Sequence, residues 1–181
     1  QMGRNTKNTT RALHWGFGGF VLVMLSLGYY MTNTPYSDGL YTWHKSLGVI
    51  LSATIGIRIY WSIRHPWQSS TSLGKIESWA RKVTHRLLVF LLFAMPASGL
   101  TSSAFSGWSV HVFNFTIVPK NLNAEGEVEA FSVTIYEAAK LTHEVLGYLF
   151  STLILLHVAA VLKHHFLNKD QTLLEMLKFK K

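Results

Sequence analysis

The 181-residue sequence contains no cysteine, and only 14% of its residues are charged, against about a quarter in a typical soluble domain. Without cysteine, the chain has no disulfides, thiolate zinc sites, iron–sulfur clusters or cysteine nucleophiles. Carboxylates are also scarce, with 9 Asp and Glu against 17 Lys and Arg. Aromatic residues, in contrast, make up 13% of the chain. This composition argues against a disordered chain, a coiled coil and an ordinary soluble α/β domain.

Charged residues occur in blocks, and the apolar segments between them have the length of membrane helices. A helix needs about 20 mainly apolar residues to cross a bilayer. The segments show no alternating period, and open strands would leave backbone groups unpaired in lipid. We therefore predict an all-α integral membrane protein, a four-helix bundle forming a single domain over residues 1–181. The predicted spans cover about residues 12–31, 44–63, 84–104 and 141–162.

Two segments need separate interpretation. Basic residues precede the first span, as in a secretory signal, but its apolar run is longer than a signal core and no clear A-x-A site follows. We expect it to remain as a membrane helix. The polar stretch at about residues 105–140 is predicted to be a long outer loop, ending from about residue 127 in an amphipathic helix that leads into the fourth span.

The distribution of Lys and Arg predicts the orientation of the chain. The segment between the first two spans has no basic residue, and the long loop has few. By the positive-inside rule, both termini are then cytoplasmic. Because topology accounts for the basic excess, we predict a lipid bilayer partner and no nucleic acid. The cytoplasmic basic residues are Arg4, Lys7 and Arg11, then Arg64, Lys75, Arg81, Lys82 and Arg86, then Lys163, Lys169, Lys178, Lys180 and Lys181.

Histidines carry the predicted chemistry. His14 begins the first span on the inner side, and His44 begins the second on the outer side. His143 and His157 are 14 residues apart in the fourth span, so they share one helix face and differ by about 21 Å in depth. His44 is then level with His143, and His14 with His157. Two layers of paired imidazoles are what two six-coordinate haems require, and they favour electron transfer over oxygen binding.

Glycines and one arginine fit the same interpretation. Gly18, Gly48 and Gly147 each follow a predicted ligand by four residues, on the same helix face, where a glycine leaves room for a porphyrin. Glycine is also common at ordinary contacts between membrane helices. Arg58 lies 14 residues after His44, at the inner depth. Its guanidinium either pairs with a haem propionate or serves as a snorkelling anchor.

The other histidines leave one alternative open. His85 begins the third span on the inner side, and it competes with His14 as the partner of His157. It alternatively contacts a propionate or a quinone head group. We interpret His164 and His165, just beyond the fourth span, as a solvated interfacial cluster. His65 and His111 lie in loops and receive no ligand role.

Three segments resemble the prokaryotic cytochrome b561 family, and more distantly the cytochrome b subunits of formate dehydrogenases and nickel–iron hydrogenases. They read ALHWGFGG, TWHKSLGVIL followed by IRIYW, and THEVLGYLF followed by LHVAAVLKHHFLNKDQTLLEML. The resemblance covers nearly all of the chain. It implies four helices that bind two b haems in the bacterial inner membrane. It also implies His14 with His157 for the inner haem and His44 with His143 for the outer one, which favours His14 over His85.

The resemblance implies electron transfer between a donor at one membrane face, such as a periplasmic partner, and a quinone such as ubiquinone. One branch of the family oxidises superoxide. The acidic run at residues 125–129 would repel that anion, whereas Lys45, Lys120 and Lys140 would attract it. The chain shows no constellation of catalytic acid, base or nucleophile. Any oxidoreductase activity would therefore be chemistry of the cofactor, and the catalytic residues stay unassigned.

Two other functions use the same histidines. A metal transporter would need polar or carboxylate residues in mid-membrane, which spans one, three and four lack at their centres. A haem-bearing membrane anchor or electron-relay subunit of a dehydrogenase- or hydrogenase-type complex would co-purify with an enzyme and would not react with quinone alone. The oligomeric state stays open, with a homodimer as one alternative.

Overall fold

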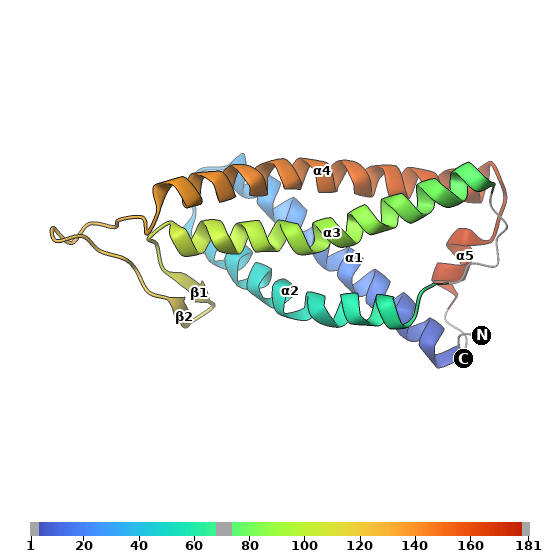
Figure 1. Ribbon diagram of the computed structural model, residues 1–181, viewed down its shortest axis with the longest axis horizontal. Helices are drawn as coiled ribbons and strands as arrows, with labels where there is room; N and C mark the ends of the chain where they lie inside the picture. Colours follow the sequence, from blue (N-terminus) through green and yellow to red (C-terminus); the bar gives the residue numbers. More distant parts are fainter. Residues whose placement is uncertain (1–3, 68–73, 179–181) are drawn as a thin grey trace.

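Four long helices make up most of the computed structural model, which describes residues 4–67 and 74–178. They lie side by side along its longest axis (Figure 1). Each is long and apolar enough to cross a membrane, which confirms the predicted membrane four-helix bundle. Every helix also extends beyond the apolar run that predicted it. The helices are α1 (Arg4–Thr32), α2 (Asp38–Arg64), α3 (Lys75–Phe105), α4 (Val133–Phe166) and the short α5 (Thr172–Leu177).

The segment between α3 and α4 contains a β-hairpin that the sequence analysis did not predict. Strands β1 (Val110–Val112) and β2 (Phe115–Val118) pair antiparallel. The fully buried Ser46 of α2 joins the hairpin to the bundle. Its hydroxyl donates to the His111 carbonyl (3.4 Å) and accepts from the Phe113 amide (2.8 Å). Strands of three and four residues are too short to give a reliable alternating pattern.

The helix that leads into the fourth span begins later than expected. Residues near 127 are not helical, because Leu122 and Val128 pair in an isolated bridge. Helix α4 starts at Val133, where the Ser132 hydroxyl caps it by accepting from the Ile135 amide. It then continues without interruption to Phe166. The predicted leading helix and the fourth span are therefore one rigid element.

The helices do not all pack against each other. Helix α3 packs along α4, and α2 packs against both α1 and α3. Among the described residues, neither α1 nor α2 makes extensive close backbone contact with α4. Figure 1 shows α3 and α4 side by side, with the start of α1 and the helix α5 at the same end of the bundle. We call that end the inner end, and the end with the hairpin the outer end.

A small apolar core joins all four long helices at mid-height. Its buried members are Val21, Leu51, Ile55, Leu91, Leu92 and Phe150. Many other large apolar side chains on the helices are exposed, among them Leu22, Ile57, Phe93 and Leu155. A soluble protein rarely exposes so much contiguous apolar surface. Lipid is the solvent in which these helix faces are stable.

The core occupies a regular position relative to the predicted ligands. Val21 follows His14 by seven residues, Leu51 follows His44 by seven, and Phe150 lies seven residues from both His143 and His157. Seven residues are close to two helical turns, about 10 Å of rise, so each core residue lies on the face of its histidine. The apolar core therefore separates an outer histidine layer from an inner one.

Two histidine layers as the candidate functional site

The structure brings the four predicted ligands together in the predicted pairs. In the outer layer, the ring centroids of His44 on α2 and His143 on α4 are 6.2 Å apart, with the ring planes at 84°. In the inner layer, the centroids of His14 on α1 and His157 on α4 are 6.3 Å apart, with the planes at 62°. Two pairs at different depths thus have almost the same spacing.

That spacing fits one metal atom between two imidazoles. Imidazole nitrogens bind first-row metals at about 2.0 Å, and each nitrogen is about 1.1 Å from its ring centroid, so two axial rings are roughly 6 Å apart. Directly hydrogen-bonded or stacked rings would be closer. The rings in both layers are therefore at the separation that a bis-histidine haem requires.

One of the four rings has a buried nitrogen without a hydrogen-bond partner in residues 4–67 and 74–178. The Nδ1 atom of His44 is buried and has no partner among the described residues. The structure gives His14 and His157 no hydrogen bond within the described part of the chain. His143 uses only Nδ1, which donates to the Met95 carbonyl at 2.9 Å. Because buried polar groups are normally paired, these imidazoles fit a binding partner that the chain itself does not supply.

The three predicted glycines differ in the space around them. A Cβ atom at Gly18 would meet nothing within 4 Å. At Gly48 it would lie 3.7 Å from the Cε of Met24, and at Gly147 3.3 Å from the Cε of Met95. Both neighbours are ends of flexible side chains, which adapt readily to an occupant. A flat macrocycle thus fits best beside Gly18 and requires methionine tips to move in the other two places.

Arg58 lies where the sequence places it, near the inner layer. It is half-buried on α2, and its guanidinium is close enough to act electrostatically on the ring of His14. No carboxylate forms an ion pair with it in the described residues. An unpaired cation at this depth is costly unless an anion accompanies it. A haem propionate is an anion of the right kind, and a guanidinium binds carboxylates well.

His85 also approaches the inner layer, but with a different geometry. Its ring centroid is 5.2 Å from that of His157, in an edge-to-face arrangement. This separation is shorter than the spacing expected for two ligands of one metal. The His85 side chain is exposed, and its Nδ1 donates to the Arg81 carbonyl in its own helix at 2.7 Å. The spacing therefore favours His14 as the partner of His157.

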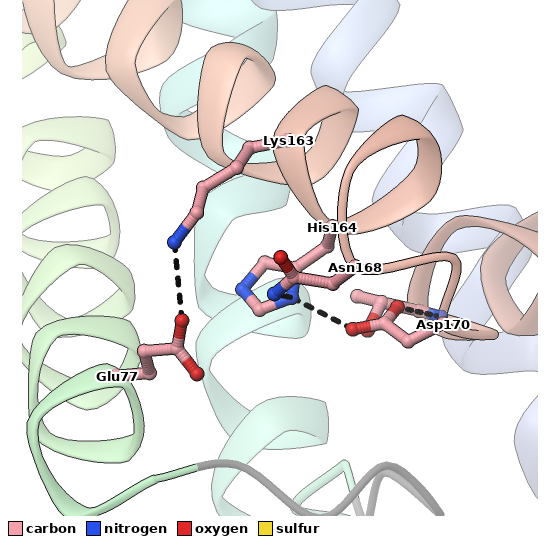
Figure 2. Close-up of polar contacts among 6 residues, drawn as sticks. Glu77, Lys163, His164, Asn168 and Asp170 are labelled. Atoms are coloured by element: carbon pink, nitrogen blue, oxygen red, sulfur yellow. Dashed lines mark hydrogen bonds and ion pairs between the residues drawn. The ribbon is translucent and has the colours of Figure 1, made fainter.

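The histidines in the last turn of α4 do not form the solvated cluster that we expected. The His164 side chain is only 14% exposed, and its Nδ1 lies 2.7 Å from a carboxylate oxygen of Asp170. The Nδ1 of His165 is buried without a partner in the described residues. Figure 2 shows His164 facing Asp170, beside an ion pair of 3.1 Å between Lys163 and Glu77. The expectation of a solvated pair was wrong, because the chain folds back after α4 and brings Asn168 and Asp170 against His164.

Helix α5 is attached to the inner end of α1. The buried Arg11 donates from Nε to the Glu175 carbonyl at 2.6 Å. Trp15 donates from Nε1 to the Met176 carbonyl at 3.0 Å. Both carbonyls are in the last turn of α5, where backbone acceptors have no helical donor. The C-terminal segment thus covers α1 beside His14, and no motif in the sequence predicted this contact.

Asp170 holds the connection between α4 and α5. Its carboxylate accepts from His164 and from the Thr172 amide at 2.9 Å. Burial raises the pKa of this carboxyl, but the hydrogen bonds from Thr172 and His164 outweigh it and leave the pKa below its ordinary value. A carboxyl whose pKa is lower in the folded chain than in the unfolded chain stabilises the fold at pH values above its unfolded pKa. This stabilisation is lost as the pH falls through the pKa of the folded state.

We therefore expect Asp170→Ala to loosen α5 at neutral pH. A hydrogen bond to a charged group contributes about 1.5–3 kcal/mol, so amide exchange in residues 172–177 should rise about tenfold or more by hydrogen-exchange mass spectrometry. The wild type should approach the same change only as the pH falls below the ordinary pKa of an aspartate, about 3.9, and through the lower folded pKa of this carboxyl. Glu77→Gln is the matched control, because its exposed ion pair should contribute little. Unchanged exchange in Asp170→Ala would contradict the role of this carboxylate.

Neither layer resembles a site for a bare metal ion. No group of three or more His, Asp or Glu side chains that could hold one occurs in residues 4–67 and 74–178. Each layer has one facing pair of imidazoles, with His85 beside the inner pair. A facing pair is an incomplete set for a protein-bound ion but suits a haem. This arrangement disfavours the metal transporter.

Comparisons with known proteins agree with the geometry. The sequence profile of the family described as prokaryotic cytochrome b561 matches residues 5–179. The chain belongs to the prokaryotic cytochrome b561 family. It is 32% identical over 171 residues to cytochrome b561 homolog 2 of Escherichia coli (strain K12), covering 92% of this chain and 87% of that protein. Cytochrome b561 homolog 1 of the same organism is 27% identical over 150 residues, covering 81% and 74%.

Membership of the cytochrome b561 family implies a membrane b-type cytochrome and electron transfer. The predicted family is thus confirmed, and a b-type haem is the cofactor that the family implies. The imidazole spacing, the unpaired Nδ1 of His44 and the lack of extensive close backbone contact of α4 with α1 or α2 in the described residues all fit such a group. These are properties of this chain and do not depend on the comparison.

Proposed function

We propose that this protein is a di-haem membrane cytochrome that transfers electrons between a donor at its outer end and a quinone such as ubiquinone. Two imidazole pairs of almost equal spacing, at two depths of one helix, carry this proposal. His44 and His143 hold the outer b haem, and His14 and His157 hold the inner one. When bound, the haems would supply reversible one-electron transfer.

The remaining site residues bind a haem propionate, leave space for the haems or exclude water. Arg58 pairs with a propionate of the inner haem, and Gly18, Gly48 and Gly147 leave space beside the helix backbones. The apolar core at Val21, Leu51 and Phe150 keeps water out of the interval between the layers. His85 is exposed, so its side chain is accessible to a quinone head group.

Superoxide is our candidate for the donor. Lys45 follows the outer ligand His44, is half-buried and forms no ion pair with a described residue. Three acidic residues that would repel an anion, Glu125, Glu127 and Glu129, lie in the segment between β2 and α4, which extends away from the helix ends (Figure 1). Glu144, in contrast, directly follows the other outer ligand, His143. An isolated cation next to the outer layer would raise the local concentration of a small anion. Lys45 is therefore the feature that supports an anionic donor.

The proposed location is the bacterial inner membrane, with both chain ends in the cytoplasm. The inner end of the bundle carries most of the Lys and Arg, as cytoplasmic ends of membrane helices do. The outer end then faces the periplasm, where a donor would meet the His44–His143 layer.

Spectroscopy and rapid kinetics on the purified full chain test the proposal. We expect a red protein with low-spin b-type bands and two haems per chain in a pyridine haemochrome assay. In stopped-flow experiments, superoxide should reduce it, and a ubiquinone analogue should reoxidise it. Haem without reduction by superoxide would point to the alternative, a relay subunit of a dehydrogenase- or hydrogenase-type complex. A colourless protein from haem-replete cells would contradict the proposal entirely.

A further inference from the structure

Helix α3 supplies no imidazole to the outer layer, yet it holds one of that layer's rings. The Nδ1 of His143 lies 2.9 Å from the Met95 carbonyl and 3.2 Å from the Ser98 hydroxyl. Ser98 in turn donates to the same carbonyl at 2.7 Å. A carbonyl oxygen only accepts, so Nδ1 carries the proton. This contact fixes the tautomer of His143 and leaves the Nε2 lone pair free for a metal.

Gly99 lies directly under the same ring. A Cβ atom there would be 2.8 Å from Cε1, 3.0 Å from Nδ1 and 3.5 Å from Nε2 of His143. Side-chain carbons almost never approach other atoms as closely as the first of these distances. The affected edge of the ring includes both nitrogens, one bonded to Met95 and one available to a metal. Any side chain at Gly99 would therefore displace the ring and its metal-binding edge.

The two rings of the outer layer consequently differ in their support. His143 is held by α3, whereas the buried Nδ1 of His44 has no partner in the described residues. An imidazole whose second nitrogen donates to a carbonyl is a more basic ligand, and its orientation is fixed. In haem proteins, such hydrogen bonds are one of the means by which the protein sets the reduction potential.

We propose that residues 95–99 of α3 are the positioning element of the outer haem ligand. The Met95 carbonyl fixes the tautomer of His143, Ser98 adjusts that hydrogen bond, and Gly99 provides the space for the ring. This proposal rests on the proposed haem function, and it concerns the outer haem alone.

Gly99→Ala is the first test, in the full-length protein purified in detergent. We expect loss of one of the two haems, the outer one, with the inner haem keeping its wild-type spectrum and midpoint potential. Gly16→Ala is the matched control. It makes the same change within α1, where a Cβ would meet nothing within 4 Å. Gly16 follows His14 by two residues, so it lies on the opposite side of the helix. The control should retain both haems.

Ser98→Ala is the second test, and it decides the question if Gly99→Ala accumulates poorly. It removes a hydroxyl that shares the Met95 carbonyl, and it adds no volume. We expect both haems to remain and the midpoint potential of the outer haem alone to shift in a spectroelectrochemical titration. A merely structural serine would leave that potential unchanged.

The outcomes separate this proposal from the function on which it rests. A wild-type protein that binds no haem would contradict the proposed function. A wild type with two haems, together with wild-type spectra and potentials in both variants, would overturn only the positioning role of residues 95–99.

Discussion

Replacing His143 with alanine should remove the proposed outer haem and leave the inner one in place. The two layers are 14 residues apart on α4, about 21 Å, and each has its own second ligand on another helix. A b haem has no covalent attachment to the chain, so loss of one axial nitrogen weakens its binding severely. The haemochrome assay should report a fall from two haems per chain to one, and a redox titration should show one remaining component.

The hairpin provides a control for the His143 experiment. His111 is also on the outer side, but both of its ring nitrogens are hydrogen-bonded, to Ser109 at 2.8 Å and Thr116 at 3.1 Å. His111→Ala should therefore keep both haems. Retention of both haems in His143→Ala would refute the pairing of His44 with His143.

His14→Ala and His85→Ala should have opposite effects on the retention of the inner haem. His14→Ala should lose the inner haem, because His14 and His157 have the spacing of two axial ligands. His85→Ala should keep it, since the His85 ring is too close to His157 to share a metal with it and is exposed. Visible spectra and haem content of the two purified variants measure the difference directly.

The two variants of this second experiment control for each other, because each removes one imidazole near His157. The reverse outcome, with the inner haem lost only in His85→Ala, would assign the ligand to α3. In that case, His14 would be a neighbour of the site and not part of it.

The histidine pairs were predictable from the sequence for a physical reason. A continuous helix has a fixed rise and rotation per residue, so the interval between His143 and His157 determines both their depths and their common face. The span ends then give His44 as the level partner of His143, and they place both His14 and His85 level with His157. The family resemblance agreed with this geometry, and the observed ring separations in both layers fit it.

The supporting contacts of the site were not predictable in this way. A backbone carbonyl such as that of Met95 has no signature in a sequence, and Gly99 resembles any glycine at a contact between membrane helices. The contacts of Arg11 and Trp15 with α5 join residues more than 160 positions apart. Helix ends were misjudged because apolar runs mark the lipid-facing part of a helix. Backbone hydrogen bonding continues beyond them, as at Val133.

The uninterrupted course of α4 has an energetic consequence for the cell. An electron that passes between the levels of His143 and His157 moves about 21 Å along the helix, roughly two-thirds of a hydrocarbon layer about 30 Å thick. A unit charge that crosses the whole membrane potential changes in energy by about 2.3 kcal/mol per 100 mV. Each such transfer therefore exchanges about 1.5 kcal/mol per 100 mV with the electric field of the membrane. The voltage across an energised membrane would accordingly slow electron flow in one direction and assist it in the other.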